Sequence, residues 1–257
     1  MKININNHVF LLIEKKYSDI ESTISNIFCS FINDENSKIK IKNKTYYDFV
    51  EIDSNEYDVK QKISDMKKLF ENQSIEKSGF KFYVIRNVEN LSKSSINTLL
   101  KFIEDPPKKT IGIFTTRNIN MVIETIRSRC EEITVNSDYD FFEKYIIDNN
   151  LREYKKIYFE GFYNISDIES MDQKQIETII NFNKYFTSNF TYNNTLLEKL
   201  KEFKKLQYRE IENIIDSIKY MFDTNKYCEF LRLIDSVKSN LNKTLIFYSI
   251  IKIIKEG

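Results

Sequence analysis

The chain has 257 residues, 41% hydrophobic and 30% charged, which allows one large domain or two to three small ones with a substantial core. Its formal net charge of +1 predicts no broad basic field, and therefore no strong independent binding to nucleic acid. Three scattered cysteines, with no signal peptide and no membrane-length apolar run, predict a cytoplasmic protein without a disulfide framework, a zinc cluster or a membrane contact.

The first half of the chain alternates strands with helices. Short runs rich in aromatic and β-branched residues predict five buried strands, over Val9–Ile13, Tyr47–Ile52, Phe80–Ile85, Ile111–Thr116 and Ile133–Val135. Apolar residues at helical spacing predict helices over 20–31, 59–70 and 93–104. The intervening stretch Phe31–Thr45 is rich in Asn, Lys and Ser, and we expect a surface loop there. The pattern predicts an α/β domain with a parallel sheet.

Beyond Asn136 the pattern is wholly helical. Apolar residues at helical spacing predict helices over 138–149, 151–160 and 173–186, and further helices from about Phe190 to the end. The last helix is apolar on most sides, which is typical of helices that pack on other chains. The lysines near Lys201 alternate with glutamates, so we expect a solvated face there and no DNA site.

One stretch carries a specific resemblance. The string NTLLKFIEDPP (97–107) is followed by a strand that ends in Thr115-Thr116 and then by ETIRSRC (124–130). Together these motifs resemble the clamp-loader branch of the AAA+ ATPases. Weaker similarity extends through YDFVEID (47–53) and into the last helices, so it covers most of the chain. The resemblance implies a RecA-like AAA+ domain over 1–136, a helical lid over 137–188 and a helical collar, which mediates oligomerisation, over 189–257.

The resemblance also implies a site. In this family a Ser-Arg-Cys motif carries the arginine that reaches into a neighbouring subunit's ATP site, and here those residues are Ser128, Arg129 and Cys130. A guanidinium suits this role because it is always charged and can donate two bonds to a phosphate. The alternative is that Arg127 and Arg129 are ordinary surface arginines near a helix C-terminus, which favours cations. We expect Ser128 and Cys130 to support Arg129, with Cys130 as a small buried residue.

The nucleotide-binding elements of active relatives are missing from this sequence. Their glycine-rich phosphate loop corresponds to Glu14–Asp19, which has no glycine and two carboxylates. Their magnesium-binding acidic pair corresponds to Arg86 and Asn87, with Glu89 slightly downstream. Gly161 lies where the family has its second sensor motif, but 162–164 supplies no arginine.

Three smaller expectations concern polar groups in the first half of the chain. The polar sensor position after the fourth strand, at Thr115, Thr116 and Asn118, is expected to satisfy strand-end backbone groups. Many relatives carry a four-cysteine zinc module, whereas this region has only Cys29, so we predict no zinc. For the only histidine, His8, we expect no ligand or base role because no second His and no Cys lies near it in sequence.

A Ser-Arg-Cys motif without these nucleotide elements resembles the delta-prime type of subunit in the bacterial replicative clamp loader, part of the DNA polymerase III holoenzyme, and the resemblance implies a non-hydrolysing subunit. Such a subunit is not an enzyme alone and binds no cofactor; the ATP and magnesium belong to its neighbour. The implied partners are gamma/tau-like ATPase subunits, a delta subunit, the sliding clamp and, through the complex, primed DNA in the nucleoid. Two alternatives remain: an active gamma/tau-like ATPase subunit, and a non-ATPase DNA-binding adaptor with an AAA-like fold.

Overall fold

The computed structural model describes residues 7–149, 151, 162–169, 171–187, 195–219, 224–238 and 241–255. The chain divides into two compact units, Met1–Asp138 and Tyr139–Gly257. The predicted helix over 151–160 and Gly161 lie outside the described residues, apart from residue 151 itself.

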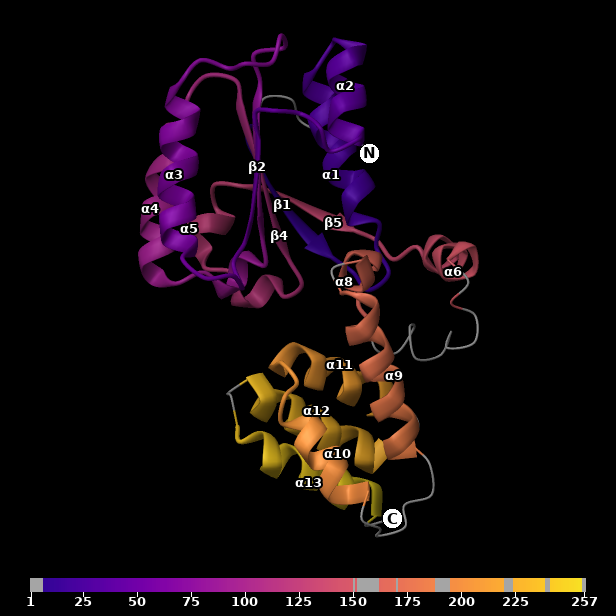
Figure 1. The fold of residues 1–257 in the computed structure, drawn as a ribbon. Helices are drawn as coiled ribbons and strands as arrows, with labels where there is room; N and C mark the ends of the chain where they lie inside the picture. The colour runs from indigo at the N-terminus through magenta and orange to yellow at the C-terminus, as the bar shows by residue number, and fades with distance from the viewer. Residues whose placement is uncertain are drawn as a thin grey trace. The chain divides into compact units, whose positions relative to one another are not determined.

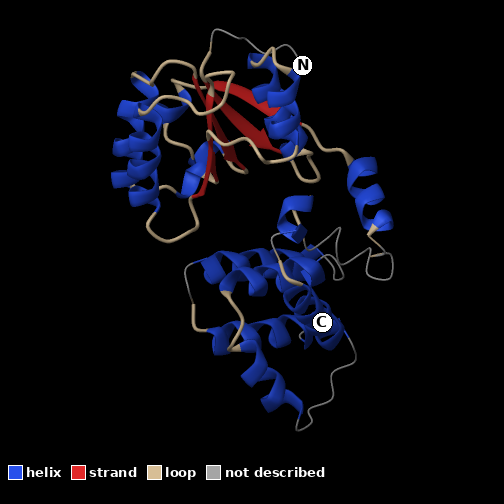
Figure 2. Ribbon diagram, turned by 45° about the horizontal axis from the view of Figure 1, so that its top comes forward, coloured by secondary structure: helices blue, strands red, loops and turns tan. Residues whose placement is uncertain are grey.

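Unit 1 is built on one five-stranded parallel sheet, as predicted (Figure 2). The strands lie in the order β2-β3-β4-β1-β5, with bounds β1 Val9–Glu14, β2 Phe49–Asp53, β3 Lys81–Arg86, β4 Thr110–Thr116 and β5 Glu131–Val135. Strand β1, which lies between β4 and β5, pairs with β4 through Leu11 and Phe114, and with β5 through Leu11 and Glu132. Because every pairing is parallel, all carboxyl ends of the strands meet at one edge and all amino ends at the other.

Helices cover both faces of this sheet (Figure 1). One face carries α1 (Ile20–Phe31) and α2 (Glu35–Lys42), and the other carries α3 (Val59–Glu71), α4 (Lys93–Glu104) and α5 (Glu124–Arg127). Successive residues of β1 alternate between the two cores: Leu11 packs in the α3–α4 core and Leu12 in the α1–α2 core. This burial on both faces explains the continuous apolar run in the sequence.

The expected loop over Phe31–Thr45 is wrong, because α2 lies within it. Its start is fixed by Asp34, whose carboxylate accepts the backbone N–H of Ser37 at 3.0 Å. Only Ser37 and Ile41 of its eight residues are buried, and Ile39 is exposed. The helix therefore has almost no apolar face, and hydrophobic periodicity could not predict it.

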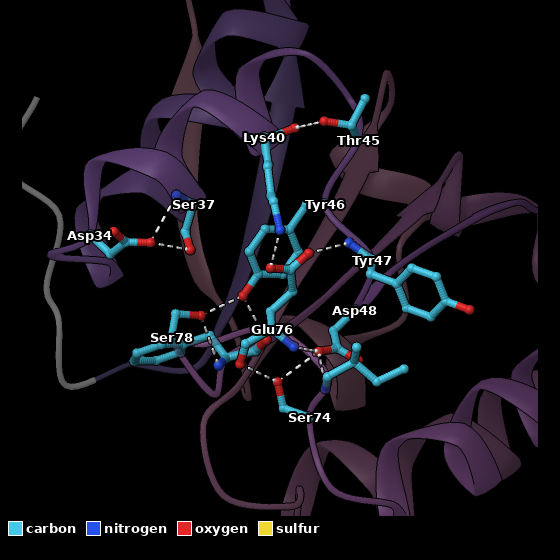
Figure 3. Close-up of polar contacts among 12 residues, drawn as sticks. Asp34, Ser37, Lys40, Thr45, Tyr46, Tyr47, Asp48, Ser74, Glu76 and Ser78 are labelled. Carbon is cyan, nitrogen blue, oxygen red and sulfur yellow. Dashed lines mark hydrogen bonds and ion pairs between the residues drawn. The ribbon is translucent and has the colours of Figure 1, made fainter.

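Two buried carboxylates tie α2 to the connection between α3 and β3 (Figure 3). The Asp48 carboxylate accepts hydrogen bonds from the Ser74 hydroxyl at 2.6 Å and from the Glu76 N–H at 2.9 Å. Glu76 in turn accepts from Lys40 Nζ at 2.7 Å and from the Tyr47 N–H at 3.0 Å. These contacts link segments up to 36 residues apart at the amino end of β2.

The described part of unit 2 is wholly helical (Figure 2). Its helices are α6 (Tyr139–Asp148), α8 (Ile165–Glu169), α9 (Gln173–Thr187), α10 (Thr195–Phe203), α11 (Tyr208–Lys219), α12 (Thr224–Lys238) and α13 (Lys243–Lys255). α9 packs on α11 and α13, around the buried rings of Phe182, Phe186, Phe203 and Phe247. The division of the chain into 1–136, 137–188 and 189–257 stays a prediction. None of the helices in the described ranges has the length and apolar character needed to cross a membrane.

Candidate functional site

The carboxyl edge of the sheet is where a nucleotide would lie, between β1 and α1. The connecting loop is closed by hydrogen bonds within the chain. The Lys15 N–H donates to the Val135 carbonyl at 3.1 Å, and the Ser18 N–H donates to the Lys15 carbonyl at 3.0 Å. The Tyr17 carbonyl accepts the Asp138 N–H at 3.1 Å. A phosphate-binding loop keeps its amides free for the ligand, whereas these two amides are already used.

The N-terminus of α1 is capped by the chain itself. The Asp19 carboxylate accepts the N–H of Ser22 at 3.0 Å, at the helix end whose free amides hold phosphate in nucleotide-binding loops. The carboxylate also brings negative charge to the place that a phosphate would occupy. Glu14, the last residue of β1, is buried. Its carboxylate pairs with Arg117 Nε at 3.5 Å.

Arg86, at the carboxyl end of β3, is held by two glutamates from other elements. Its Nη2 lies 2.6 Å from Glu21 Oε1 in the first turn of α1, and its Nε donates to Glu51 of β2. The Arg86 side chain is only 17% exposed. The Arg86 guanidinium therefore joins β3, α1 and β2 through two ion pairs, at the position where the resemblance places a metal-binding carboxylate.

The charges in this cluster shift the pKa values of its members. Burial alone would raise the pKa of Glu21, but the positive charges of Arg86 and Lys44, with their hydrogen bonds, outweigh it and hold this pKa below its ordinary value. Burial likewise acts to lower the pKa of Arg86, but Glu21 and Glu51 outweigh it and raise that pKa. Both side chains are therefore charged at neutral pH, and each neutralises the charge of the other.

The polar residues at the sensor position serve the backbone, which confirms that expectation for two of them. The Thr115 hydroxyl accepts the Asn87 N–H at 3.4 Å, and the Thr116 hydroxyl accepts the Asn118 N–H at 3.1 Å. Both threonines are fully buried. Asn118 uses its side-chain oxygen to accept the Asn120 N–H at 3.2 Å, in the short 3-10 turn that follows β4.

The remaining candidates for a metal at this edge also have protein partners. The Asn87 amide donates to Asp53 Oδ1 at 3.0 Å, and Glu89 Oε1 accepts the Arg117 N–H at 3.1 Å. Across the described ranges, no group of three His, Cys, Asp or Glu is arranged to hold a metal ion. The side chains at this edge do not fit a nucleoside triphosphate with magnesium.

Arg129 lies at the opposite, amino edge of the sheet. It directly precedes β5, whose first residue Glu131 pairs with Phe10 near the start of β1. β5 runs for five residues, and a strand of that length spans about 16 Å. Arg129 is therefore separated from its own chain's β1–α1 loop by the length of the sheet, and it is 37% exposed.

The side chain of Arg129 is ordered by contacts within the chain. Its Nε and Nη2 donate to Glu104 Oε1 at 3.0 and 2.7 Å. Its Nη1 donates to the Thr125 carbonyl at 2.8 Å and lies 3.4 Å from the Ser128 hydroxyl. The neighbouring Arg127 instead pairs with Glu132 at 2.8 Å. The two arginines thus differ in surroundings although they are two residues apart.

A family model described as DNA polymerase III, delta subunit matches residues 4–138, which is more than half of the chain. The chain belongs to the DNA polymerase III delta subunit family. An uncharacterised protein of Mycoplasma pneumoniae is 23% identical over 252 residues, which cover 95% of this chain and 97% of that protein. A DNA polymerase III gamma subunit of Buchnera aphidicola is 36% identical over 99 residues, covering 37% of this chain and 26% of that subunit.

Two further comparisons bear on this delta subunit family member. The delta-prime subunit of Bacillus subtilis is 34% identical over 53 residues, covering 21% of this chain and 16% of that subunit. A gamma subunit-related protein of Thermotoga maritima has a similar fold, with a TM-score of 0.59 at 15% identity, covering 97% of this chain and 94% of that structure. The resemblance inferred from the motifs is thereby confirmed. The predicted class, a RecA-like AAA+ domain with a parallel sheet followed by helical domains, is also confirmed.

Other candidate residues of this family member have structural partners. His8 Nε2 lies 3.0 Å from the Ile103 carbonyl, so the ring donates to the last turn of α4. The Cys29 thiol lies 3.8 Å from the Lys38 carbonyl of α2 and donates to it. Cys130 was expected to be a small buried residue; it is partly buried, and burial raises its pKa to about 12.

Sequence reasoning missed two glutamates that this site uses. Glu104 is followed at once by Asp-Pro-Pro and was treated only as the end of a helix, although it holds Arg129. Glu21 is not singled out by the sequence patterns, although it pairs with Arg86. In both cases the partner lies 25 or more residues away in sequence, so no local pattern connects them.

Proposed function

We propose that this chain is a non-hydrolysing, delta-prime-like subunit of the bacterial replicative clamp loader and supplies Arg129 in trans to a neighbouring ATPase subunit. The single observation that carries the proposal is the place of Arg129. It is exposed at the amino edge of the sheet, a sheet length away from the β1–α1 loop where the fold would place a nucleotide. This position suits an arginine that meets a phosphate on another subunit.

The carboxyl edge supports the non-hydrolysing part of the proposal. Two loop amides are used within the chain, the α1 N-terminus is capped by Asp19, and Arg86 occupies the position of a metal-binding carboxylate. We infer that the chain binds neither ATP nor magnesium at this edge. The ATP and magnesium belong to the neighbouring subunit.

The mechanism follows from the chemistry of phosphoryl transfer. Charge spreads over the equatorial oxygens of the transferred phosphoryl group, and a guanidinium from a neighbouring protein stabilises it. In this proposal Arg129 donates to the γ-phosphate of the neighbour's ATP, and hydrolysis releases the loaded sliding clamp on primed DNA. The chain is not an enzyme alone; it assists a reaction that the neighbour carries out.

The proposed partners are gamma/tau-like ATPase subunits, a delta subunit and the sliding clamp, with primed DNA bound by the whole complex in the cytoplasm. The near-zero net charge supports DNA contact through the assembly rather than by this chain alone. On α13, Leu245 and Tyr248 lie three residues apart on one helix face and are 56% and 40% exposed. Exposed apolar side chains of this size are suited to contact with another subunit.

The test is ATP hydrolysis by the reconstituted loader in the presence of primed DNA and clamp, with this chain as wild type and as Arg129→Ala. We expect kcat to fall at least about tenfold, because a trans arginine contributes a thousandfold or more in GTPases and several ATP sites share the work here. Assembly, measured by gel filtration, should be unchanged. Arg129→Lys should recover only part of the rate because the planar fork is lost.

Arg127→Ala is the matched control. It removes an arginine two residues away that is paired with Glu132 and Glu124, so the loss of charge is the same. We expect its rate to stay within about twofold of wild type. An intact complex in which Arg129→Ala hydrolyses ATP at the wild-type rate would refute the trans-arginine role.

One observation favours a second candidate, an active ATPase subunit: the 36% identity to a gamma subunit over 99 residues. Tight binding of ATP by the isolated chain would support this candidate. The closed loop after β1 and the Asp19 cap argue against it.

A further inference from the structure

The guanidinium of Arg129 is held from two sides by groups on different helices. Glu104, the last residue of α4, accepts from Nε and Nη2, and the Thr125 carbonyl of α5 accepts from Nη1. A guanidinium is a planar fork with five N–H donors. The edge formed by Nε and Nη2 therefore faces Glu104, while Nη1 is held by the helix that precedes it.

Nη2 has one N–H beyond its bond to Glu104, and Nη1 donates to the Thr125 carbonyl and, at 3.4 Å, to the Ser128 hydroxyl. That contact is long and neutral, and a phosphate oxygen forms a shorter and stronger bond to a guanidinium. A phosphate that replaces the Ser128 hydroxyl would thus meet one donor on Nη1 and one on Nη2, while Glu104 and Thr125 hold the rest of the fork.

The Glu104–Arg129 pair contributes little to folding, because both side chains are well exposed, at 51% and 37%. What the pair does is restrict a long side chain that otherwise samples many rotamers. An interaction of this kind acts on orientation, and orientation governs the rate when a reacting group must meet its target in one geometry.

We propose that Glu104 is the positioning residue of Arg129: it orients the guanidinium so that these donors on Nη1 and Nη2 face the neighbouring subunit's phosphate. The inference rests on the proposed function, since it requires Arg129 to act in trans. It adds a residue from α4 to a site otherwise confined to Ser128, Arg129 and Cys130. The Asp-Pro-Pro that ends α4 fixes where Glu104 stands.

The experiment uses the reconstituted loader with the full chain carrying Glu104→Ala or Glu104→Gln, and measures ATP hydrolysis with primed DNA and clamp. We expect Glu104→Ala to lower kcat about three- to tenfold. The KM for ATP should stay within about twofold, because the nucleotide sits in the neighbour's own site. Glu104→Gln keeps an oxygen that accepts from both nitrogens, so it should retain most of the rate.

Glu132→Ala is the matched control, because it removes an equally placed carboxylate that pairs with Arg127 at 2.8 Å. Its rate should match wild type. Glu104→Asp is a second test that keeps the charge: its carboxylate is one methylene too short for both bonds, so kcat should fall. Glu104→Asp also decides the question if Glu104→Ala fails to assemble.

The double variant Glu104→Ala with Arg129→Ala separates the two proposals. If Glu104 acts through Arg129, adding Glu104→Ala to Arg129→Ala causes no further loss. If Arg129→Ala alone leaves the rate unchanged, the proposed function fails. If Arg129→Ala lowers the rate but Glu104→Ala leaves it unchanged, or raises it by releasing a restrained arginine, the positioning role alone is overturned.

Discussion

Cys130 shows how one residue of the Ser-Arg-Cys motif differs from the arginine beside it. Its thiol packs against the apolar core between the sheet and α4, whereas Arg129 points to solvent. Burial, with a smaller contribution from Glu132, raises the pKa of Cys130 from 9.0 to about 12, and Arg129 only partly opposes them. Folding therefore favours the neutral thiol. The stability that this contributes is present below pH 9 and is lost as the pH rises from 9 toward 12.

We predict that Cys130 is slow to alkylate in the folded protein. At a pH of about 8.5 its thiolate fraction should be roughly a thousandfold smaller than that of an ordinary cysteine. Iodoacetamide labelling, followed by mass spectrometry of the peptides, should therefore modify Cys228, which is exposed, well before Cys130. The urea-unfolded chain is the control, and there the two should react alike. Equal rates in the folded protein would contradict the burial of this thiol.

The motif predicted Arg129 as the key residue of the site, but it did not predict the contacts that orient it. A motif reports which residue types stand next to each other in sequence. Glu104 and Arg129 are 25 residues apart in sequence. They meet only because α4 ends beside the start of β5. That Arg86 is a poor metal ligand stays a prediction, and its two glutamate partners come from α1 and β2, so they required the fold to be known.

Among the elements, β4 depends on one glycine. Gly112 pairs with Tyr83 of β3, and a Cβ built on Gly112 would lie 2.1 Å from the Tyr83 ring. That ring is fully buried and packs against Phe70, Phe102 and Phe114. The close approach of the ring to the β4 backbone, and not the backbone conformation, requires glycine here.

We predict that Gly112→Ala lowers the free energy of unfolding by about 1–3 kcal/mol, because Tyr83 must shift within a filled core. Urea denaturation of the full chain measures this. Replacing Tyr83 by Leu in the same chain should remove most of the extra cost, since the atoms that clash are those of the ring. An unchanged midpoint for Gly112→Ala would show that the core around Tyr83 adapts freely.

The elements that the sequence predicted well are those with strong apolar patterns. All five strands and the helices α1, α3 and α4 bury continuous or periodic apolar residues, and these were placed within a few residues of their bounds. α2 was missed because its start is set by Asp34 and its position by the Lys40–Glu76 pair. A capping residue and a long-range ion pair produce no periodic pattern of apolar residues in the sequence.

At the scale of the whole molecule, the two edges of the sheet in unit 1 have different roles. The carboxyl edge is closed by internal hydrogen bonds and by the Arg86 ion pairs. The amino edge presents Arg129 to solvent. At the carboxyl edge Lys15, Asp19 and Arg86 have partners within the chain, and in the proposed function Arg129 at the amino edge meets a neighbouring subunit.

We predict that ATP with magnesium does not stabilise the isolated chain. A ligand at a hundred times its Kd adds about 2.7 kcal/mol to the free energy of unfolding. For a chain of this size that would raise Tm by about 5 °C or more. We expect a shift below about 1 °C in a thermal melt, with a gamma subunit as positive control. A shift of several degrees would support the active ATPase candidate.

The closed carboxyl edge also bears on how such a chain can evolve. Regaining hydrolysis would require a glycine-containing loop after β1, an α1 N-terminus released from Asp19, and a carboxylate in place of Arg86. Under the proposed function no one of these changes alone is sufficient, and replacing Arg86 first would remove the cation that Glu21 and Glu51 share, leaving Glu21 paired with Lys44. Each single step toward an ATPase would then lower stability or gain nothing, so the proposed division of labour with an active neighbour would be hard to reverse.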